Sequence, residues 1–377
     1  MVRRILGIII VLLILIPSNL IMAQEDYSVP NEYEDIEDAL PEDVTELLPD
    51  GIFSNNTDEI IEGVKIISDW NYLIDFLFDT IGLNIKDIIK TFAIILSLLL
   101  ICSLLNMFRN TLNNQATDGV IGLVTNIATA SLLVEISRTP LSRAMTLLEN
   151  LKLFVNSISP CITAMYAMGG NITSALIHNY GFIVFLSIME NICIVSLEMI
   201  VGICMALALS AAFTQESNLL SLSNGIKNIF SFIWIFITII FTTVISTQSL
   251  LATKADNLSS KTAKMLATQI IPLAGGTIGE SLRTAGASIE YLRTNVGVVF
   301  VIVLVIMIAP TLISIFLYRL VFIISHSISG MIGTEREGRV ILEISSIYGY
   351  VLAVIGISSI ILLFLITVFA KCASPLS

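Results

Sequence analysis

Four ionisable residues in or beside long apolar stretches give the best indication of chemistry in this sequence. Glu190 and Glu198 are about two helical turns apart in the apolar block Phe182 to Phe213, so both carboxylates lie near one side of a helix. Arg319 and His326, near the end of another block, also share a face. Because a charge at bilayer depth is costly unless paired, protonated or hydrated, we predict that the four line a polar cavity. Alternatively, Glu190 marks a break between two short helices and lies among lipid headgroups.

Nothing in the residue pattern indicates catalysis or a cofactor. No nucleotide-binding loop, zinc-protease motif or nucleophile elbow occurs, and His178 and His326 are far apart. The cysteines lack metal-ligand spacing and lie in or beside apolar runs, which favours buried thiols. We expect a protein that is not an enzyme and holds no metal or cofactor. The cysteines are Cys102, Cys161, Cys193, Cys204 and Cys372.

Composition sets the class of protein that must position these residues. Of 377 residues, 55% are hydrophobic and 13% charged, and the mean hydropathy is +0.91, so most of the chain lies in lipid. The net charge of -11 is concentrated in residues 24–87, where Lys65 and Lys86 are the basic residues. No clustered basic face is present, which argues against nucleic acid as a partner.

The first 23 residues have the features of a secretory signal peptide. Arg3 and Arg4 form the positive start, the apolar run Ile5 to Ile16 is too short to span a bilayer, and Ala23 is a small residue at the expected cleavage point. Without cleavage, the run would remain as a membrane anchor. In both cases we expect the next segment to be exported.

That next segment, residues 24–87, is acidic. Acids and prolines up to Asn56 predict disorder or loosely held short helices. From Asp58 the apolar residues take helical spacing, which predicts a helix at the membrane interface. Two roles stay open for this extracytoplasmic segment: a solvated acidic arm, or a docking arm for a basic partner outside the membrane.

Residues 88–377 predict an all-α polytopic membrane domain with about five to eight transmembrane helices. Pro160 should interrupt one block and Pro310 kink another, and the long block Phe182 to Phe213 is either one tilted helix or two joined helices. The connection Ala252 to Asn295 is the richest in bases and should face the cytoplasm, although an exported amino end conflicts with simple span counting. The apolar blocks are Ile88 to Leu105, Gly119 to Ile136, Thr146 to Ala167, Phe182 to Phe213, Ile226 to Leu250, Val296 to Ser325 and Tyr350 to Ala370.

Between two of these blocks lies Gln269 to Arg293, which is broken and amphipathic. Its start should be an irregular turn, followed by a helix from Glu280 with Arg283 off the apolar stripe. Such an insertion either lies on the interface or re-enters the bilayer. The residues that predict the turn are Pro272, Gly275, Gly276 and Gly279.

A weak internal repeat is also visible. Ser157 to Ala175 and Gln269 to Ala287 each contain a proline followed by Gly-Gly and precede an over-long apolar block. The repeat would divide the membrane domain into halves 146–250 and 254–370. Similar halves with interrupted segments are typical of transporters with a site at the repeat interface, while chance similarity among apolar helices is the alternative.

The chain resembles the stage III sporulation protein AE family of endospore-forming bacteria. The resemblance covers nearly the whole chain, with a signal-like start, an acidic exported segment and a multi-span half. It is most specific in the stretch I-P-x-x-G-G, then E-S-L-R-T-A, then a long apolar block. These correspond to Ile271, Pro272, Gly275 and Gly276, to Glu280 to Ala285, and to Val296 to Leu320.

The resemblance implies a membrane platform or conduit in a transenvelope channel, or feeding tube, that links mother cell and forespore and supports late forespore gene expression. Its implied partners are other stage III membrane and ring-forming proteins, a cytoplasmic secretion-type ATPase and a forespore membrane protein reached through the intermembrane space. Its implied location is the mother-cell membrane around the forespore. A stand-alone secondary transporter of a small solute or ion and a purely structural scaffold stay open as alternatives.

Overall fold

The computed structural model describes residues 33, 35–38, 40–45, 48–49, 51–54, 57–67, 70–112, 115–188, 193–214, 217–270 and 275–371, with the side chains of 263–291 outside this description. Helix dominates these residues, and no strand occurs among them. Five of the helices described are long and apolar enough to cross a membrane, which confirms the predicted all-α membrane fold. These stretches are Phe78–Phe108, Val120–Met168, Asn218–Ser259, Leu292–Met331 and Glu335–Phe369.

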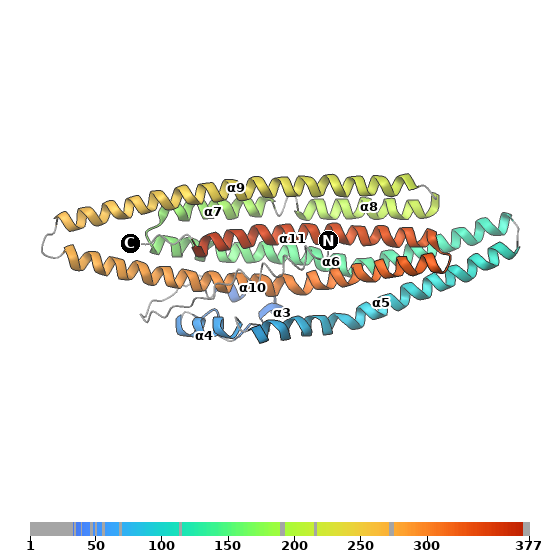
Figure 1. Cartoon of the computed structure of the whole chain (residues 1–377), viewed down its shortest axis with the longest axis horizontal. Helices are drawn as coiled ribbons and strands as arrows, with labels where there is room; N and C mark the ends of the chain where they lie inside the picture. The colour runs from blue at the N-terminus through green and yellow to red at the C-terminus, as the bar shows by residue number, and fades with distance from the viewer. Residues whose placement is uncertain are drawn as a thin grey trace.

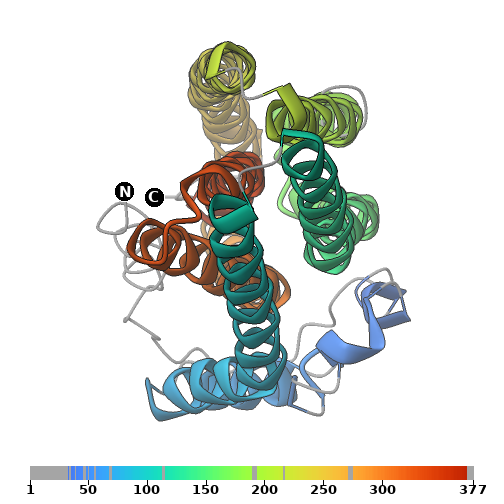
Figure 2. The ribbon, with the colours of Figure 1, turned by 90° about the vertical axis from the view of Figure 1, so that its right-hand side faces the viewer.

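The long helices lie side by side in an elongated bundle (Figure 1). Helix α6 contacts α5, α7, α8, α10 and α11, and Figure 2 shows it between α5 and the α10–α11 pair. At 57 residues, α10 is roughly 85 Å long, far more than the hydrocarbon core of about 30 Å, so only part of it fits in lipid. The long helices are α5 (Trp70–Leu112), α6 (Gln115–Met168), α9 (Ser217–Ile270), α10 (Gly275–Met331) and α11 (Glu335–Lys371).

Helices α10 and α11 form a tight antiparallel hairpin. The chain reverses at Gly333, whose φ of 74° lies in the left-handed region that glycine adopts without strain. Five residues later, a Cβ on Gly338 would lie 1.8 Å from Ser329 Oγ, so only glycine allows this approach of the two helices.

Two shorter helices, α7 (Ile172–Ile188) and α8 (Val195–Thr214), lie nearly end to end along α9 (Figure 1). The block Phe182 to Phe213 is therefore two helices, the second of the predicted alternatives. Asp256 of α9 fixes the start of α7, since its carboxylate accepts hydrogen bonds from the backbone N–H groups of Thr173 at 3.1 Å and Ser174 at 2.8 Å. The Ser174 hydroxyl adds a third bond at 2.6 Å. Asp256 thus satisfies N–H groups that have no partner within α7.

Two local predictions were wrong. Pro160 does not interrupt a block, because α6 continues through Pro140 and Pro160 and joins the blocks Gly119 to Ile136 and Thr146 to Ala167. Similarly, α10 begins at Gly275 and runs without a break into the apolar span, so an irregular turn does not extend to Gly279 and the insertion is not separate. In apolar surroundings, leaving several backbone groups unpaired costs more than one proline defect or a few glycines.

The segment before α5 packs against the bundle. It contains the short helices α2 (Asp35–Asp38), α3 (Glu42–Thr45) and α4 (Thr57–Ile67). Tyr33 is fully buried, with its ring centroid 5.5 Å from that of Phe53 and 6.1 Å from that of Phe300 in α10. Its hydroxyl donates to the Ile52 carbonyl oxygen at 2.8 Å, and burial raises the pKa of Tyr33 well above its usual value. Export of this segment stays a prediction, and residues 1–23 lie outside the described residues.

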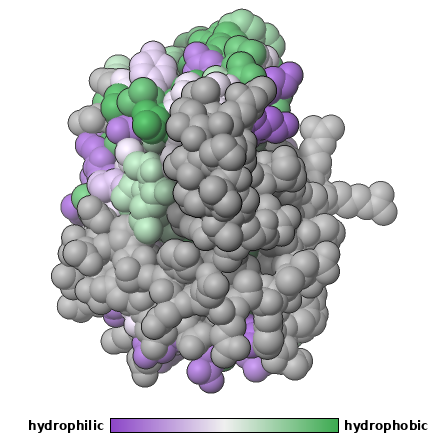
Figure 3. Space-filling view, turned by 90° about the vertical axis from the view of Figure 1, so that its left-hand side faces the viewer, coloured by the Kyte–Doolittle hydropathy of each residue, from purple (hydrophilic) through white to green (hydrophobic). Residues whose placement is uncertain are grey.

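Much of the bundle surface is apolar, as a lipid-facing surface should be. Seen from the end where α9 finishes, apolar side chains lie at the top, the side on which α9 and α7 lie, together with some hydrophilic ones, and further hydrophilic side chains lie on the flank and lower edge (Figure 3). The outer face of α9 exposes large apolar residues, which favours contact with acyl chains over water. They include Ile229, Phe232, Phe236, Ile239 and Ile240.

Candidate functional site: a polar cavity between helices α5, α6 and α10

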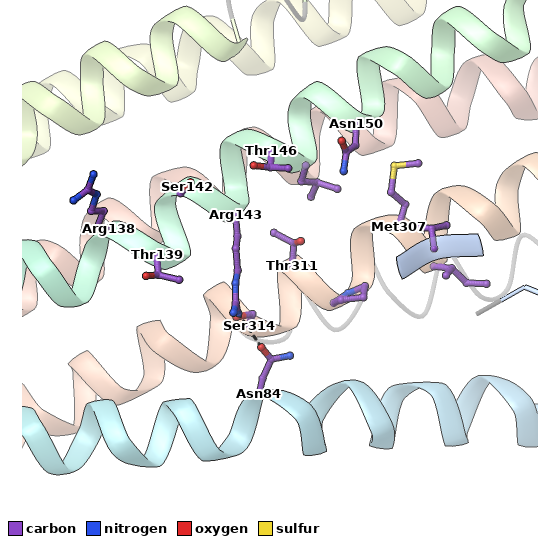
Figure 4. Close-up of a pocket in the computed structure, with 14 residues that line it drawn as sticks. Asn84, Arg138, Thr139, Ser142, Arg143, Thr146, Asn150, Met307, Thr311 and Ser314 are labelled. Atoms are coloured by element: carbon purple, nitrogen blue, oxygen red, sulfur yellow. Dashed lines mark hydrogen bonds between the residues drawn. The ribbon is translucent and has the colours of Figure 1, made fainter. Parts of the chain in front are cut away.

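A polar cavity of about 610 Å³ lies between α5, α6 and α10 (Figure 4), and Val44 of α3 is also among its lining residues. Most of its lining side chains carry hydroxyl, amide or guanidinium groups, although the surrounding helices are largely apolar. The polar lining residues are Asn84, Arg138, Thr139, Ser142, Arg143, Thr146, Asn150, Thr311 and Ser314, and the apolar ones are Val44, Leu147, Ile306, Met307 and Pro310.

Helical periodicity places four of these groups on one wall. Arg138, Ser142, Thr146 and Asn150 follow one another at intervals of four residues, so they form a stripe along α6. The stripe lies between two apolar runs of the same helix. This pattern is visible in the sequence, and it is the signal by which the cavity could have been predicted.

Arg143 extends across the cavity. Its guanidinium lies between α6 and α5 in Figure 4, near Ser314 of α10, and donates a hydrogen bond to Asn84 Oδ1 at 3.3 Å. This distance is at the long end for an N–H···O bond, so the contact is weak. Because the bond is long and its acceptor is a neutral amide, Arg143 can exchange this contact for water or an anion.

Pro310 removes one helical hydrogen bond from α10 beside the cavity. Pro310 has no N–H, so it cannot donate to the carbonyl oxygen of Ile306 four residues earlier. Both residues line the cavity. The carbonyl oxygen of Ile306 therefore lacks the usual helical hydrogen bond from residue 310.

The chemistry of the lining suits binding or passage. Among the described lining residues there are two arginines and no carboxylate, so the wall carries positive charge together with neutral donors and acceptors. Such a wall can hold water and small anions. It places no nucleophile beside a general base, the arrangement that covalent catalysis requires.

A second polar feature joins α9 to α11, and we call it the ion-pair cluster: Ser223, Asn224, Lys227, Glu343 and Ser346. Lys227 Nζ and Ser223 Oγ both donate to Glu343 Oε1, while Lys227 Nζ also donates to Ser346 Oγ at 2.8 Å. Ser346 Oγ in turn donates to Asn224 Oδ1 at 3.2 Å. The side chains of Lys227 and Glu343 are only 5% and 4% exposed, so each charge is neutralised by the other within the protein.

The sequence-predicted residues occupy different places. Arg319 packs on α11 where Gly349 leaves room, since a Cβ there would lie 2.9 Å from Arg319 Cζ. His326 Nδ1 lies 2.8 Å from the carbonyl oxygen of Gly338 at the hairpin turn. Glu198 is exposed on α8 and lines neither the cavity nor the ion-pair cluster.

The remaining predicted residues are only partly visible. Glu190 and Pro272 lie outside the described residues, so a cavity shared by the two glutamates stays a prediction. Gly275, Gly276, Gly279, Glu280 and Arg283 belong to the first turns of α10, and their roles also stay predictions. Sequence reasoning did not find the ion-pair cluster, because Lys227 and Glu343 come from helices far apart in the chain.

The cysteines behave as predicted where they are described. Cys102, Cys161, Cys193 and Cys204 are buried free thiols. Cys193 Sγ lies 3.0 Å from Ser358 Oγ, and Cys102 Sγ lies 3.7 Å from Thr129 Oγ1, so both pack against hydroxyl groups of neighbouring helices. Cys372 lies outside the described residues.

Long apolar helices beside a polar cavity without carboxylates define the class: a helical membrane protein with a polar hollow between its helices. The stage III sporulation protein AE family matches residues 53–373, and the chain belongs to this family. Stage III sporulation protein AE of Bacillus subtilis (strain 168) is 24% identical over 282 residues, which cover 72% of this chain and 69% of that relative. No solved structure matches. Family membership confirms the resemblance carried by the motifs between Ile271 and Leu320.

Proposed function

We propose that this protein is the membrane platform or conduit of a sporulation transenvelope channel that links mother cell and forespore. The observation that carries the proposal is the polar cavity between α5, α6 and α10 in a member of a stage III sporulation family. A scaffold alone would have no need of hydroxyl, amide and guanidinium groups around a space of about 610 Å³. Polar groups within apolar helices are costly unless they serve a pathway or a contact.

In this proposal the cavity is one polar section of the route. Arg143 can exchange its long bond to Asn84 for a passing anion or water, and the stripe on α6 supplies successive partners along the helix. The protein has no enzymatic activity of its own, and a cytoplasmic secretion-type ATPase supplies the energy. The protein lies in the mother-cell membrane around the forespore.

The proposed partners are those that the family resemblance implies, and two polar parts of the chain are proposed as their contact sites. The acidic residues 24–87 face the intermembrane space, where ring-forming stage III proteins and a forespore membrane protein would contact them. The basic connection between α9 and α10 faces the cytoplasm and the ATPase. Opposite charge on the two sides would favour different partners at each.

Affinity purification tests the assembly. The tagged full chain is recovered from membranes of sporulating cells, and the proteins that purify with it are identified. Recovery of an ATPase and ring-forming envelope proteins supports the channel. Recovery of the chain alone, together with normal spores after its deletion, would instead favour a stand-alone transporter, for which the helix break between α7 and α8 is the motivating feature.

Thiol labelling tests the conduit part separately. Ser142→Cys and Thr146→Cys place thiols in the cavity, whereas the four described native cysteines are buried. A conduit predicts that a charged, membrane-impermeant thiol reagent modifies both variants in sporulating cells, and that modification blocks late forespore gene expression. Ile229→Cys, on the exposed apolar face of α9, is the matched control that lipid should shield. Normal gene expression after full modification of Ser142→Cys would contradict the conduit role and favour a structural scaffold.

A further inference from the structure

One end of the polar cavity combines a cation with a buried hydroxyl group. Ser314 of α10 lines the cavity and is only 2% exposed, yet its Oγ makes no hydrogen bond within the part of the chain that the structure describes. Thr311, one turn earlier on the same side of α10, also lines the cavity. In Figure 4 both side chains lie close to the guanidinium of Arg143, which comes from α6. A buried hydroxyl without a partner is costly unless water or a ligand satisfies it.

Arg143 keeps hydrogen-bond donors that no described residue uses. Its guanidinium carries five N–H donors, and among the described residues it donates one bond, to Asn84 Oδ1. Asn84 is itself held in place, because its Nδ2 donates to the carbonyl oxygen of Thr80 at 2.8 Å. Within the described ranges Arg143 forms no ion pair, and the described cavity lining contains no carboxylate. The positive charge of Arg143 is therefore not neutralised by any described group.

This end of the cavity presents a single positive charge. Arg138 lies five residues before Arg143, so the two side chains leave α6 roughly 140° apart, and Figure 4 shows them extending in opposite directions. One guanidinium balances one negative charge, and its planar fork forms two parallel hydrogen bonds with a carboxylate. A doubly charged phosphate would keep one charge uncompensated here.

Apolar side chains in the same cavity favour an organic anion over an inorganic one. Leu147 of α6 and Met307 and Pro310 of α10 line the space, whose volume of about 610 Å³ is far more than a bare ion fills. These side chains offer contact to a short hydrocarbon chain, as apolar linings do in small-molecule sites.

We infer that the Arg143 end of the polar cavity binds the carboxylate group of a small organic monoanion. Arg143 supplies the charge, and the hydroxyl groups of Ser314 and Thr311 act as neutral donors. This names a class of solute for the conduit and rests on the proposed function for that use, whereas binding itself can be measured on the isolated protein.

The test uses the full chain purified in a neutral detergent, with butyrate as the probe. Ligand-observed NMR gives the Kd and thermal unfolding gives Tm, both at constant ionic strength. Butyramide has nearly the same shape without the charge, and inorganic phosphate supplies a tetrahedral anion. We expect butyrate to bind and to raise Tm, butyramide to leave Tm unchanged, and phosphate to bind more weakly than butyrate.

Three variants assign the contacts. Arg143→Gln should weaken butyrate binding about tenfold, whereas Lys90→Gln, with the same loss of charge at an exposed position of α5 that does not line the cavity, should bind it as the wild type does. Ser314→Ala should weaken binding about fivefold without lowering Tm in the absence of butyrate, because its hydroxyl has no described partner to lose. A hydroxyl with a structural role would lower Tm and leave butyrate binding unchanged.

The inference fails if butyramide binds as well as butyrate, if phosphate binds more tightly, or if Arg143→Gln binds butyrate normally. Failure of the proposed function gives a different pattern. Loss of butyrate binding in Arg143→Gln, together with normal forespore gene expression after thiol modification of Ser142→Cys, would keep the carboxylate site and remove the conduit. Blocked gene expression in a protein that binds butyrate no better than butyramide would keep the conduit and overturn the carboxylate site.

Discussion

Two charged regions of this apolar bundle differ in their surroundings. In the ion-pair cluster, Lys227 and Glu343 are nearly inaccessible, oppositely charged and bonded to each other. In the polar cavity of about 610 Å³, the described lining residues include Arg138 and Arg143 but no carboxylate. Arg143 donates a long hydrogen bond of 3.3 Å to the neutral side chain of Asn84. One region neutralises its charges within the protein, whereas the other offers them to a ligand or solvent.

The difference separates structural charge from functional charge. A buried pair that satisfies itself contributes mainly to holding α9 against α11, since removing either partner leaves an uncompensated ion. A cationic wall that faces open space contributes little to stability but can select what enters. Substitutions in the ion-pair cluster should therefore mainly lower stability, whereas substitutions in the polar cavity should mainly lower activity.

The largest effect on stability is expected at the ion-pair cluster. Lys227→Met strands Glu343, and Glu343→Leu strands Lys227, so each single variant should lose about 3–5 kcal/mol of unfolding free energy. The double variant should recover most of this loss, because no unpaired charge remains. Thermal and denaturant unfolding of the purified chain measures all three proteins. Additive losses in the double variant would show that the two residues do not form a compensated pair.

A smaller loss is expected at Asp256, a buried charge compensated by backbone N–H groups instead of a basic residue. Asp256→Ala removes the acceptor for Thr173, Ser174 N–H and the Ser174 hydroxyl, and should cost about 1–3 kcal/mol. Asp256→Asn keeps an acceptor and should lose less. Amide hydrogen exchange at the start of α7 localises the effect, and unchanged protection there in Asp256→Ala would refute the capping role.

Neither of these two regions was predicted from the sequence, although one of them could have been. Arg138, Ser142, Thr146 and Asn150 recur every four residues within one helix, so local periodicity is sufficient to identify the cavity wall. The partnership of Lys227 and Glu343 depends on how two distant helices pack, which no local pattern contains. Arg319 was singled out from its apolar surroundings, but the groove that it shares with Arg339 also depends on packing.

The fold shows the same division. The apolar blocks were predicted from hydropathy, because burial in lipid acts on every residue of a span. Helix ends were predicted less well, since Pro160 and Gly275 favour breaks locally, while the cost of unpaired backbone in apolar surroundings favours a continuous helix. The packing of Tyr33 against Phe300 likewise joins an acidic segment to a span that lies far along the chain.

The smallest effect on stability, with a large effect on function, is expected for Arg143→Gln in the polar cavity. Its bond to Asn84 is long and the side chain is exposed, so unfolding free energy should change by less than about 0.5 kcal/mol. If the cavity is part of the conduit, heat-resistant spore counts should fall towards those of a deletion strain, because the wall loses a cation. Arg143→Lys keeps the charge and should retain much of the activity. Lys90→Gln, at an exposed position of α5 that does not line the cavity, is the charge-matched control and should sporulate normally. Normal spore counts in Arg143→Gln at wild-type protein levels would show that the charge of Arg143 is not needed for function, and would contradict a conduit role for this cavity.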